Sequence, residues 1–267
     1  MSAVRLLPQK RVEKVWGRDT LPAPFAAPRD ARIGEIWFEP PGDFDRLLAK
    51  YLFTSENLSV QVHPDDAHAP HGMTGKDECW LILEAEPGAR LAIGLERDVS
   101  RDGLAQAAQD GSIESLLTWH EPQAGDFFYL PAGTIHAVGP GLSLIEIQQN
   151  CDITYRLYDY GRPRELHLEQ ALEVAERGPF PAGLMQRLPA EGSVALVDGP
   201  KFRLDRAAAG DDGWRGRYSG MGLVMPVSGS VNIGEQAIAA GECAAVSDCA
   251  AIEFSPSAQC LVAQPIG

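Results

Sequence analysis

The sequence has few features of a secreted or membrane protein. No apolar run approaches the length needed to span a bilayer, and the first 19 residues, MSAVRLLPQKRVEKVWGRD, lack the apolar stretch and cleavage site of a secretion signal. The five cysteines form no Cys-x-x-Cys pair, and their odd number is more typical of reduced thiols than of a disulfide framework or a thiolate metal cluster. We therefore expect a cytoplasmic protein with no membrane partner.

Basic residues are also scarce. The chain has 23 Lys and Arg against 37 Asp and Glu, which gives a net charge of −14. Such a charge repels nucleic acid and anionic membrane surfaces, so neither is an expected partner. A small anionic substrate is still compatible with the sequence where basic residues gather locally, and the candidates are Lys76, Arg156, Arg162 and Arg164.

Histidine is absent from the last 100 residues. The six histidines are His63, His68, His71, His120, His136 and His167. The segment RGPFPAG, residues 177–183, separates this part of the chain from one rich in small residues and short apolar runs. We predict a metal-binding domain over residues 1–180 and a smaller β domain without metal ligands over 181–267.

Short strand-like runs separated by Gly, Pro and Asp recur along the first domain. They cover residues 31–39, 58–63, 78–84, 90–95, 126–131, 142–149 and 153–160. This spacing is typical of an antiparallel sandwich or barrel, whereas residues 97–119 and 168–176 have helical spacing. The sequence therefore predicts a mainly β protein of two barrels in tandem, with short helical insertions.

One strand carries an unusual polar face. In LSVQVHPDDAH, residues 58–68, strand alternation places Ser59, Gln61 and His63 on the face opposite the valines. Glu78 begins another strand and His136 follows a Pro-Ala-Gly turn. Taken singly, such residues more often bind nothing, but two imidazoles and a carboxylate suit Zn²⁺ with one coordination position left open. Gln61 is a weaker ligand candidate, because an amide oxygen binds zinc poorly and can instead support a ligand.

Several motifs together resemble one family. IGEIW, LSVQVHPDD, GKDECW, PAGTIHAVG, IEIQQN and ITYRLYDY occur in the order and at the spacings of the type I, cupin-fold mannose-6-phosphate isomerases, particularly the shorter bacterial kind. The resemblance covers residues 10–165, and the last third matches only in general character. It implies tandem cupin barrels and the zinc-dependent interconversion of mannose 6-phosphate and fructose 6-phosphate.

The resemblance also implies roles for particular residues. It assigns one zinc ion per chain to Gln61, His63, Glu78 and His136. It assigns catalysis to Arg156, phosphate binding to Ser59 and Lys76, and acidic positions near the sugar to Glu146 and Asp152. The chain departs from fungal and animal members at Val138, where they carry tyrosine, and it lacks their large helical domain. We therefore expect its sugar contacts to differ from those of the fungal and animal members.

Some alternatives remain open at this stage. An enediol route needs a base, and Glu146, Lys76 and a hydroxide on zinc are all candidates. Arg156 suits stabilisation of the enediolate, but it could instead be a strand arginine paired with Asp152 or Asp159. The alternative functions are a non-catalytic sugar-sensing cupin, a metal-dependent cupin oxygenase, and an isomerase of a related sugar phosphate. Oxygenases usually have no phosphate-binding lysine at the position of Lys76, which favours the isomerase.

Overall fold

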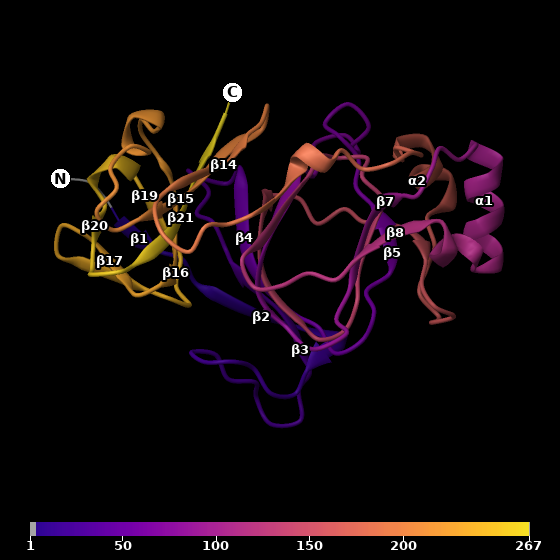
Figure 1. Cartoon of the computed structure of the whole chain (residues 1–267), viewed down its shortest axis with the longest axis horizontal. Helices are drawn as coiled ribbons and strands as arrows, with labels where there is room; N and C mark the ends of the chain where they lie inside the picture. The colour runs from indigo at the N-terminus through magenta and orange to yellow at the C-terminus, as the bar shows by residue number, and fades with distance from the viewer. Residues whose placement is uncertain (1–3, 267) are drawn as a thin grey trace.

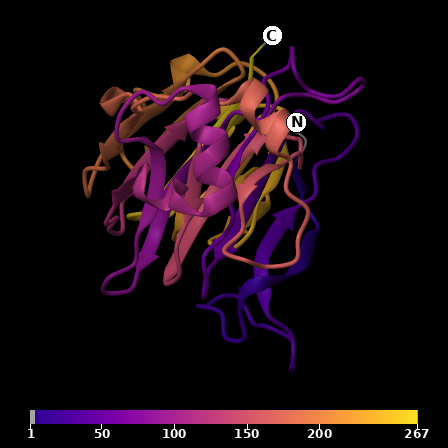
Figure 2. The same ribbon diagram turned by 90° about the vertical axis from the view of Figure 1, so that its right-hand side faces the viewer.

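The computed structural model describes residues 4–266 and consists mainly of β-strands arranged as two barrels side by side. In Figure 1 the first barrel lies on the right and the second barrel, in orange and yellow, on the left. The two α-helices, α1 (Arg101–Asp110) and α2 (Leu168–Val174), pack on the side of the first barrel that faces away from the second barrel. Figure 2 shows α1 in front of the strands. The predicted fold class, tandem β-barrels with short helical insertions, is confirmed.

Two antiparallel sheets face each other in the first barrel. The seven-stranded sheet has the order β13 (Met185–Arg187), β9 (Asp126–Leu130), β6 (Glu78–Ala85), β11 (Leu142–Gln149), β4 (Leu47–Phe53), β3 (Ile33–Phe38) and β2 (Gln9–Arg18). The five-stranded sheet has the order β12 (Tyr155–Tyr158), β5 (Val60–Val62), β10 (His136–Val138), β7 (Leu91–Leu95) and β8 (Leu117–His120). Both helices pack on the outer face of the five-stranded sheet, which leaves the interior between the sheets for the site.

The second barrel is smaller. Its six-stranded sheet has the order β1 (Val4–Leu6), β19 (Ala244–Val246), β16 (Gly222–Ser228), β21 (Gln259–Pro265), β15 (Phe202–Ala208) and β14 (Val194–Asp198). A three-stranded sheet of β18 (Gln236–Ala239), β17 (Ser230–Ile233) and β20 (Glu253–Phe254) completes it. Two strands cross the expected division at residues 180 and 181, because β1 joins the second barrel and β13 joins the first. The division into domains therefore stays a prediction. Each barrel contains one strand from the part of the chain that forms the other barrel.

The seven-stranded sheet is buried on both faces. In β11, Leu144 points into the first barrel, whereas Ile145 and Ile147 pack against the six-stranded sheet of the second barrel. The same alternation in β4 directs Lys50 into the barrel interior, beside Glu146 of β11, its partner in the strand register. Lys50 and Glu146 therefore both point into the barrel interior, where they line one cavity.

Sequence patterns missed several strands. All seven residues of β4, LLAKYLF, are buried, so the strand lacks the alternation of apolar and polar residues that marks a half-buried strand. Residues 97–119, expected to be helical, contain one α-helix and a short 3₁₀ turn, and end in strand β8. Ser100 caps α1 by accepting a hydrogen bond from the amide of Gly103, and Gly111 ends the helix with a φ of 83°. No helix within residues 4–266 is long and apolar enough to cross a membrane.

Candidate metal centre and active site

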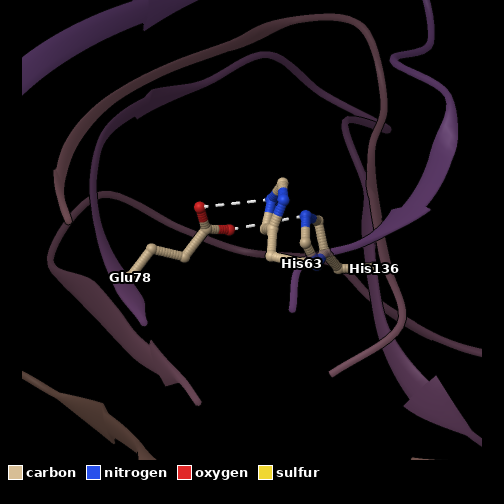
Figure 3. Close-up of side chains that lie close together, drawn as sticks. All are labelled: His63, Glu78 and His136. Atoms are coloured by element: carbon tan, nitrogen blue, oxygen red, sulfur yellow. Dashed lines mark ion pairs between the residues drawn. The ribbon is translucent and has the colours of Figure 1, made fainter. Parts of the chain in front are cut away.

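The three predicted metal ligands lie together inside the first barrel. His63 follows β5, Glu78 begins β6 and His136 begins β10, so three separate strands deliver them. Their ligand atoms all lie within 4.8 Å of one another, and all three side chains are buried. Figure 3 shows both imidazole rings directed at the Glu78 carboxylate. Strands from both sheets of the barrel therefore bring these side chains together at one point.

Hydrogen bonds determine which ring nitrogens carry protons. Nδ1 of His63 lies 2.7 Å from the carbonyl oxygen of Ile153, and Nδ1 of His136 lies 2.9 Å from that of Thr134. A carbonyl only accepts, so both Nδ1 atoms donate and both Nε2 atoms present lone pairs. These Nε2 atoms lie 3.5 Å and 3.4 Å from the oxygens of Glu78. The Nε2 lone pairs and the carboxylate oxygens repel one another, so this arrangement favours a cation between them.

The chemistry of these donors fits a divalent metal. Neither oxygen of Glu78 receives a hydrogen bond of good geometry, although both are buried. Burial raises the pKa of Glu78 to about 7 against the opposing charge of Lys76, and burial lowers the pKa of His136 to about 4. A metal ion needs neutral imidazoles and an available carboxylate, and together with the Lys76 ammonium, 2.8 Å from Oε2 of Glu78, it would offset the cost of burying these groups. Among the residues described, this cluster is a candidate metal site.

Gln61 lies beside the cluster. Its Nε2 is 3.1 Å from Nε2 of His136, and its Oε1 accepts a hydrogen bond from Oγ of Ser59 at 3.0 Å. The two ends of a glutamine amide can exchange by rotation about the last side-chain bond, so a ligand role requires the oxygen to turn towards His136. Gln61 as a fourth ligand therefore stays a prediction.

A cavity of about 260 Å³ opens beside the candidate metal site. It brings together all the predicted substrate and catalytic residues, Ser59, Lys76, Glu146, Asp152 and Arg156, and the weaker ligand candidate Gln61. These residues come from β5, β6, β11 and β12 and from the segments next to those strands. The sequence separates them by up to nearly 100 positions, and antiparallel pairing inside the barrel places them around one space.

Other cavity residues were missed by the sequence interpretation. They are Lys14, Trp16, Glu35, Trp37, Lys50, Trp80 and Thr154, whereas Arg164 was already named among the basic residues that could face an anionic substrate. Two signals could have identified some of them. Lys50 is the only charged residue in β4, and in IGEIW the alternation puts Glu35 and Trp37 on the same face. Nε1 of Trp37 donates to Oε2 of Glu35 at 2.7 Å, which fixes both side chains along the cavity wall.

Two lysines and two glutamates form a buried charge network. Nζ of Lys50 lies 3.1 Å from Oε1 of Glu146, and Nζ of Lys76 lies 2.8 Å from Oε2 of Glu78. Burial alone would lower the pKa of Lys76, but the charges of Glu146 and Glu78 outweigh it and raise that pKa. Burial opposes ionisation of Glu146, yet Lys76 and Lys50 lower its pKa to about 2. Lys76 and Glu146 are therefore both charged at neutral pH.

Lys76 lies among the predicted metal ligands. Its Nζ is 3.2 Å from Nε2 of His63, and its side chain is almost fully buried. The resemblance assigned Lys76 to the substrate phosphate, whereas this position puts its charge beside the candidate metal.

Arg156 has few partners within the described chain. It lies opposite Gln61 in the strand register, its Nε is buried without a hydrogen bond, and its Nη1 makes one long contact of 3.4 Å to the carbonyl oxygen of Glu165. Asp159, a partner considered for Arg156, pairs instead with Arg162 and Arg164. Among residues 4–266, Arg156 forms no ion pair with Asp152 or Asp159, so its guanidinium is available to a ligand.

Asp159 gives a stability prediction. Burial raises its pKa, but hydrogen bonds from Arg164 and Arg162 outweigh burial and leave the pKa lowered. The stabilisation is therefore present above the ordinary aspartate pKa and is lost as the pH falls through the lower folded value. We expect Asp159→Asn to lower the free energy of unfolding by about 2 kcal/mol at pH 7, with a smaller difference at pH 3. Urea unfolding at both pH values measures this.

A matched control is Asp43→Asn, because Asp43 forms an exposed pair with Arg5 and should contribute little. A loss for Asp159→Asn that is equal at both pH values would contradict the linkage.

Comparison with known proteins agrees with this geometry. No family model matches the chain. The chain is 42% identical over 166 residues to the mannose-6-phosphate isomerase of Streptococcus mutans, covering 58% of this chain and 52% of that protein. It is also 42% identical over 149 residues to the mannose-6-phosphate isomerase ManA of Bacillus subtilis, covering 52% of this chain and 47% of that protein. The predicted resemblance is confirmed.

Solved structures extend the likeness in fold over the whole chain. The mannose 6-phosphate isomerase of Bacillus subtilis matches with a TM-score of 0.78 at 24% identity, over 99% of this chain and 100% of that one. A zinc-bound mannose 6-phosphate isomerase matches with a TM-score of 0.72 at 14% identity, over 99% of this chain and 100% of that one. In sequence, the chain spans about half the length of the curated relatives it matches.

Proposed function

We propose that the protein is a zinc-dependent aldose–ketose isomerase that interconverts mannose 6-phosphate and fructose 6-phosphate. The observation that carries the proposal is the buried cluster of His63, Glu78 and His136 beside a cavity lined with cationic side chains. The curated relatives carry the name mannose-6-phosphate isomerase, which supports the same reaction.

The metal would be held by His63, Glu78 and His136, with Gln61 as a fourth ligand and one ion per chain. When bound, zinc would supply a Lewis acid that stabilises negative charge on a substrate oxygen. The two carbonyl oxygens that accept from the Nδ1 atoms keep both rings oriented for this role, as the outer partners of metal-binding histidines do.

A phosphorylated substrate fits the charges around the cavity. In a chain of net charge −14, a phosphate binds only where local cations oppose the overall field. The cavity is lined by five cationic side chains: Lys14, Lys50, Lys76, Arg156 and Arg164. We keep Ser59 and Asp152 as substrate contacts and assign Lys76 to the reacting end, because its ammonium lies among the metal ligands.

The reaction moves a proton between two adjacent carbons of the sugar. Arg156 is permanently charged, so its role is to orient the substrate and stabilise the enediolate oxygen rather than to act as a base. Lys76 and Glu146 both line the cavity, and Nζ of Lys76 lies 3.8 Å from Oε1 of Glu146. The ionised carboxylate of Glu146 can take the proton from carbon, whereas the charged ammonium of Lys76 can only donate one to a substrate oxygen; a hydroxide on bound zinc would be the other candidate base.

The substrate preference includes related sugar phosphates. Val138 lines the cavity where fungal and animal members of the family carry tyrosine, so one sugar contact differs from theirs. We propose mannose 6-phosphate as the main substrate, and a panel of aldose phosphates will rank the others.

A direct assay tests the proposed function. We expect purified protein loaded with zinc to convert mannose 6-phosphate to fructose 6-phosphate, measured by a coupled assay for the ketose. Dialysis against a chelator should abolish the activity because the site residues alone supply no Lewis acid, and added zinc should restore it. Zinc-loaded protein that is inactive on every hexose 6-phosphate tested would return the chain to the sugar-sensing alternative.

A further inference from the structure

Within residues 4–266, the C-terminal domain contributes no residue to the lining of the catalytic cavity, but it contacts the segment of the first barrel next to Lys76. The described residues that line the catalytic cavity all lie between Lys14 and Arg164. A turn of residues 199–201, between β14 and β15, nevertheless contacts the first barrel behind the segment that carries Lys76 and Glu78. A hydrogen bond from the amide of Gly199 to the carbonyl oxygen of Phe202 closes this 199–201 turn.

One end of the turn is linked to the site through Asp66. Nζ of Lys201 pairs with Oδ2 of Asp66. Oδ1 of Asp66 accepts from the amide of Gly75 at 2.6 Å and from Nε2 of Gln149 at 3.0 Å. Oε1 of Gln149 in turn accepts from the amide of Asp77 at 3.0 Å. The amides on both sides of Lys76 are thus connected to a lysine of the other domain.

The other end of the turn contacts Tyr129. A Cβ atom added at Gly199 would lie 2.8 Å from Oη of Tyr129, so only glycine allows this close approach without movement. Oη of Tyr129 donates to Oδ2 of Asp77 at 2.6 Å, and the ring of Phe202 packs edge-on against the ring of Tyr129. Asp77 also accepts a hydrogen bond from the amide of Ala132 at 3.0 Å.

Asp77 connects these contacts with the metal site. Side chains alternate along an extended segment, so Asp77 points away from the barrel interior, while Lys76 lines the cavity and Glu78 belongs to the candidate metal cluster. Holding Asp77 and the amide of Gly75 therefore fixes the backbone from which both inward side chains extend. Outer contacts of this kind affect metal affinity and activity even at a distance from the reacting atoms.

We propose that the 199–201 turn of the C-terminal domain is a positioning element for the metal site. Through Asp66 and Tyr129 it fixes residues 75–78 so that Lys76 and Glu78 face the metal and the substrate. Its effect on turnover rests on the isomerase function proposed above. Its effect on metal affinity and on local backbone motion does not require that function.

The test uses the full chain with Lys201→Ala and Gly199→Ala. We expect each variant to bind zinc about 10-fold more weakly, measured by competition with a chelator in the absence of sugar, because the carboxylate of Glu78 is less well placed. In the metal-free variants, hydrogen exchange should accelerate at residues 75–78 while the rest of the chain is unchanged. We expect kcat to fall by a similar factor, with little change in KM.

Three comparisons separate positioning from general destabilisation. Lys201→Arg keeps the charge next to Asp66 and should restore zinc affinity. Arg5→Ala removes an exposed basic residue that pairs with Asp43 and should have no effect. Tyr129→Phe removes the hydroxyl that a Cβ at Gly199 would approach most closely, so Gly199→Ala should cost less in the Tyr129→Phe background than in the parent.

Zinc affinity and local exchange equal to those of the parent would overturn the proposal. Exchange that accelerates across both domains together with a lower Tm would also overturn it, because the turn would then only stabilise the fold. If the parent has no isomerase activity, the proposed function fails, while zinc affinity and hydrogen exchange still decide whether the turn positions the site.

Discussion

Replacing His136 with alanine is expected to remove zinc and isomerase activity together. Nε2 of His136 is one of three lone-pair donors in the cluster, and its loss leaves two ligands for an ion that takes three or more from proteins. Loss of an outer partner of a ligand costs about 10- to 100-fold in metal affinity, so loss of the ligand itself should cost more than about 100-fold. Elemental analysis after dialysis measures zinc per chain, and the coupled assay measures turnover.

The matched control for this variant is His68→Ala. His68 is an exposed loop residue whose ring contacts Asp65, so its removal should leave zinc content and activity unchanged. A thermal melt of metal-free parent and variant checks that His136→Ala still folds. Full zinc content in a folded His136→Ala protein would show that the metal lies elsewhere.

Much of the candidate site could be predicted because strand alternation is a local rule. It separated Ser59, Gln61 and His63 from the valines between them, and it put Glu78 at the start of a strand. The convergence of His136 with these residues depends on the pairing of β10 with β5, in which His136 lies opposite Gln61. That pairing is a long-range contact, and it could be expected only from the resemblance of the motifs to a known family.

Residues on strands buried on both faces were the hardest to predict. Lys50 lies in a continuous apolar strand, where a single lysine gives no periodicity from which to assign a face. Its inward direction follows from the second barrel, which covers the outer face of the same sheet. The exchange of β1 and β13 between the two barrels was missed for the same reason, because no local pattern indicates which sheet a three-residue strand will join.

The sequence alone likewise could not predict that the ammonium of Lys76 lies between two glutamates. Its spacing two residues before Glu78 predicts only that both side chains share a face. The structure adds that Glu78 and Glu146 surround its ammonium, which keeps a buried lysine charged. The network exists because four charged side chains enter the barrel from β4, β6 and β11 and the residues beside them, and their mutual attraction offsets the cost of removing them from water.

The second large effect is expected from Arg156→Ala, which should lower kcat by about 100- to 1,000-fold while changing KM by less than about 3-fold. Nε of Arg156 is buried in the cavity wall without a partner, and the rest of the partly buried guanidinium forms no ion pair among the described residues, so it can face new negative charge. The enediolate oxygen carries that charge only as the reaction proceeds. A contact made mainly in the transition state lowers kcat when it is removed, whereas a contact shared with the bound substrate would raise KM.

Steady-state kinetics on the zinc-loaded variant measure both parameters, and Arg156→Lys and Arg101→Ala complete the series. Arg156→Lys keeps the charge but loses the planar donor array, so its kcat should lie between those of the parent and the alanine variant. Arg101 forms an exposed pair with Glu169 at the helical end of the barrel, and its removal should leave both parameters unchanged. A raised KM with normal kcat in Arg156→Ala would instead assign Arg156 to the phosphate. Bound zinc and Lys76, whose ammonium lies beside His63 and Glu78, would then have to stabilise the negative charge that grows during the reaction.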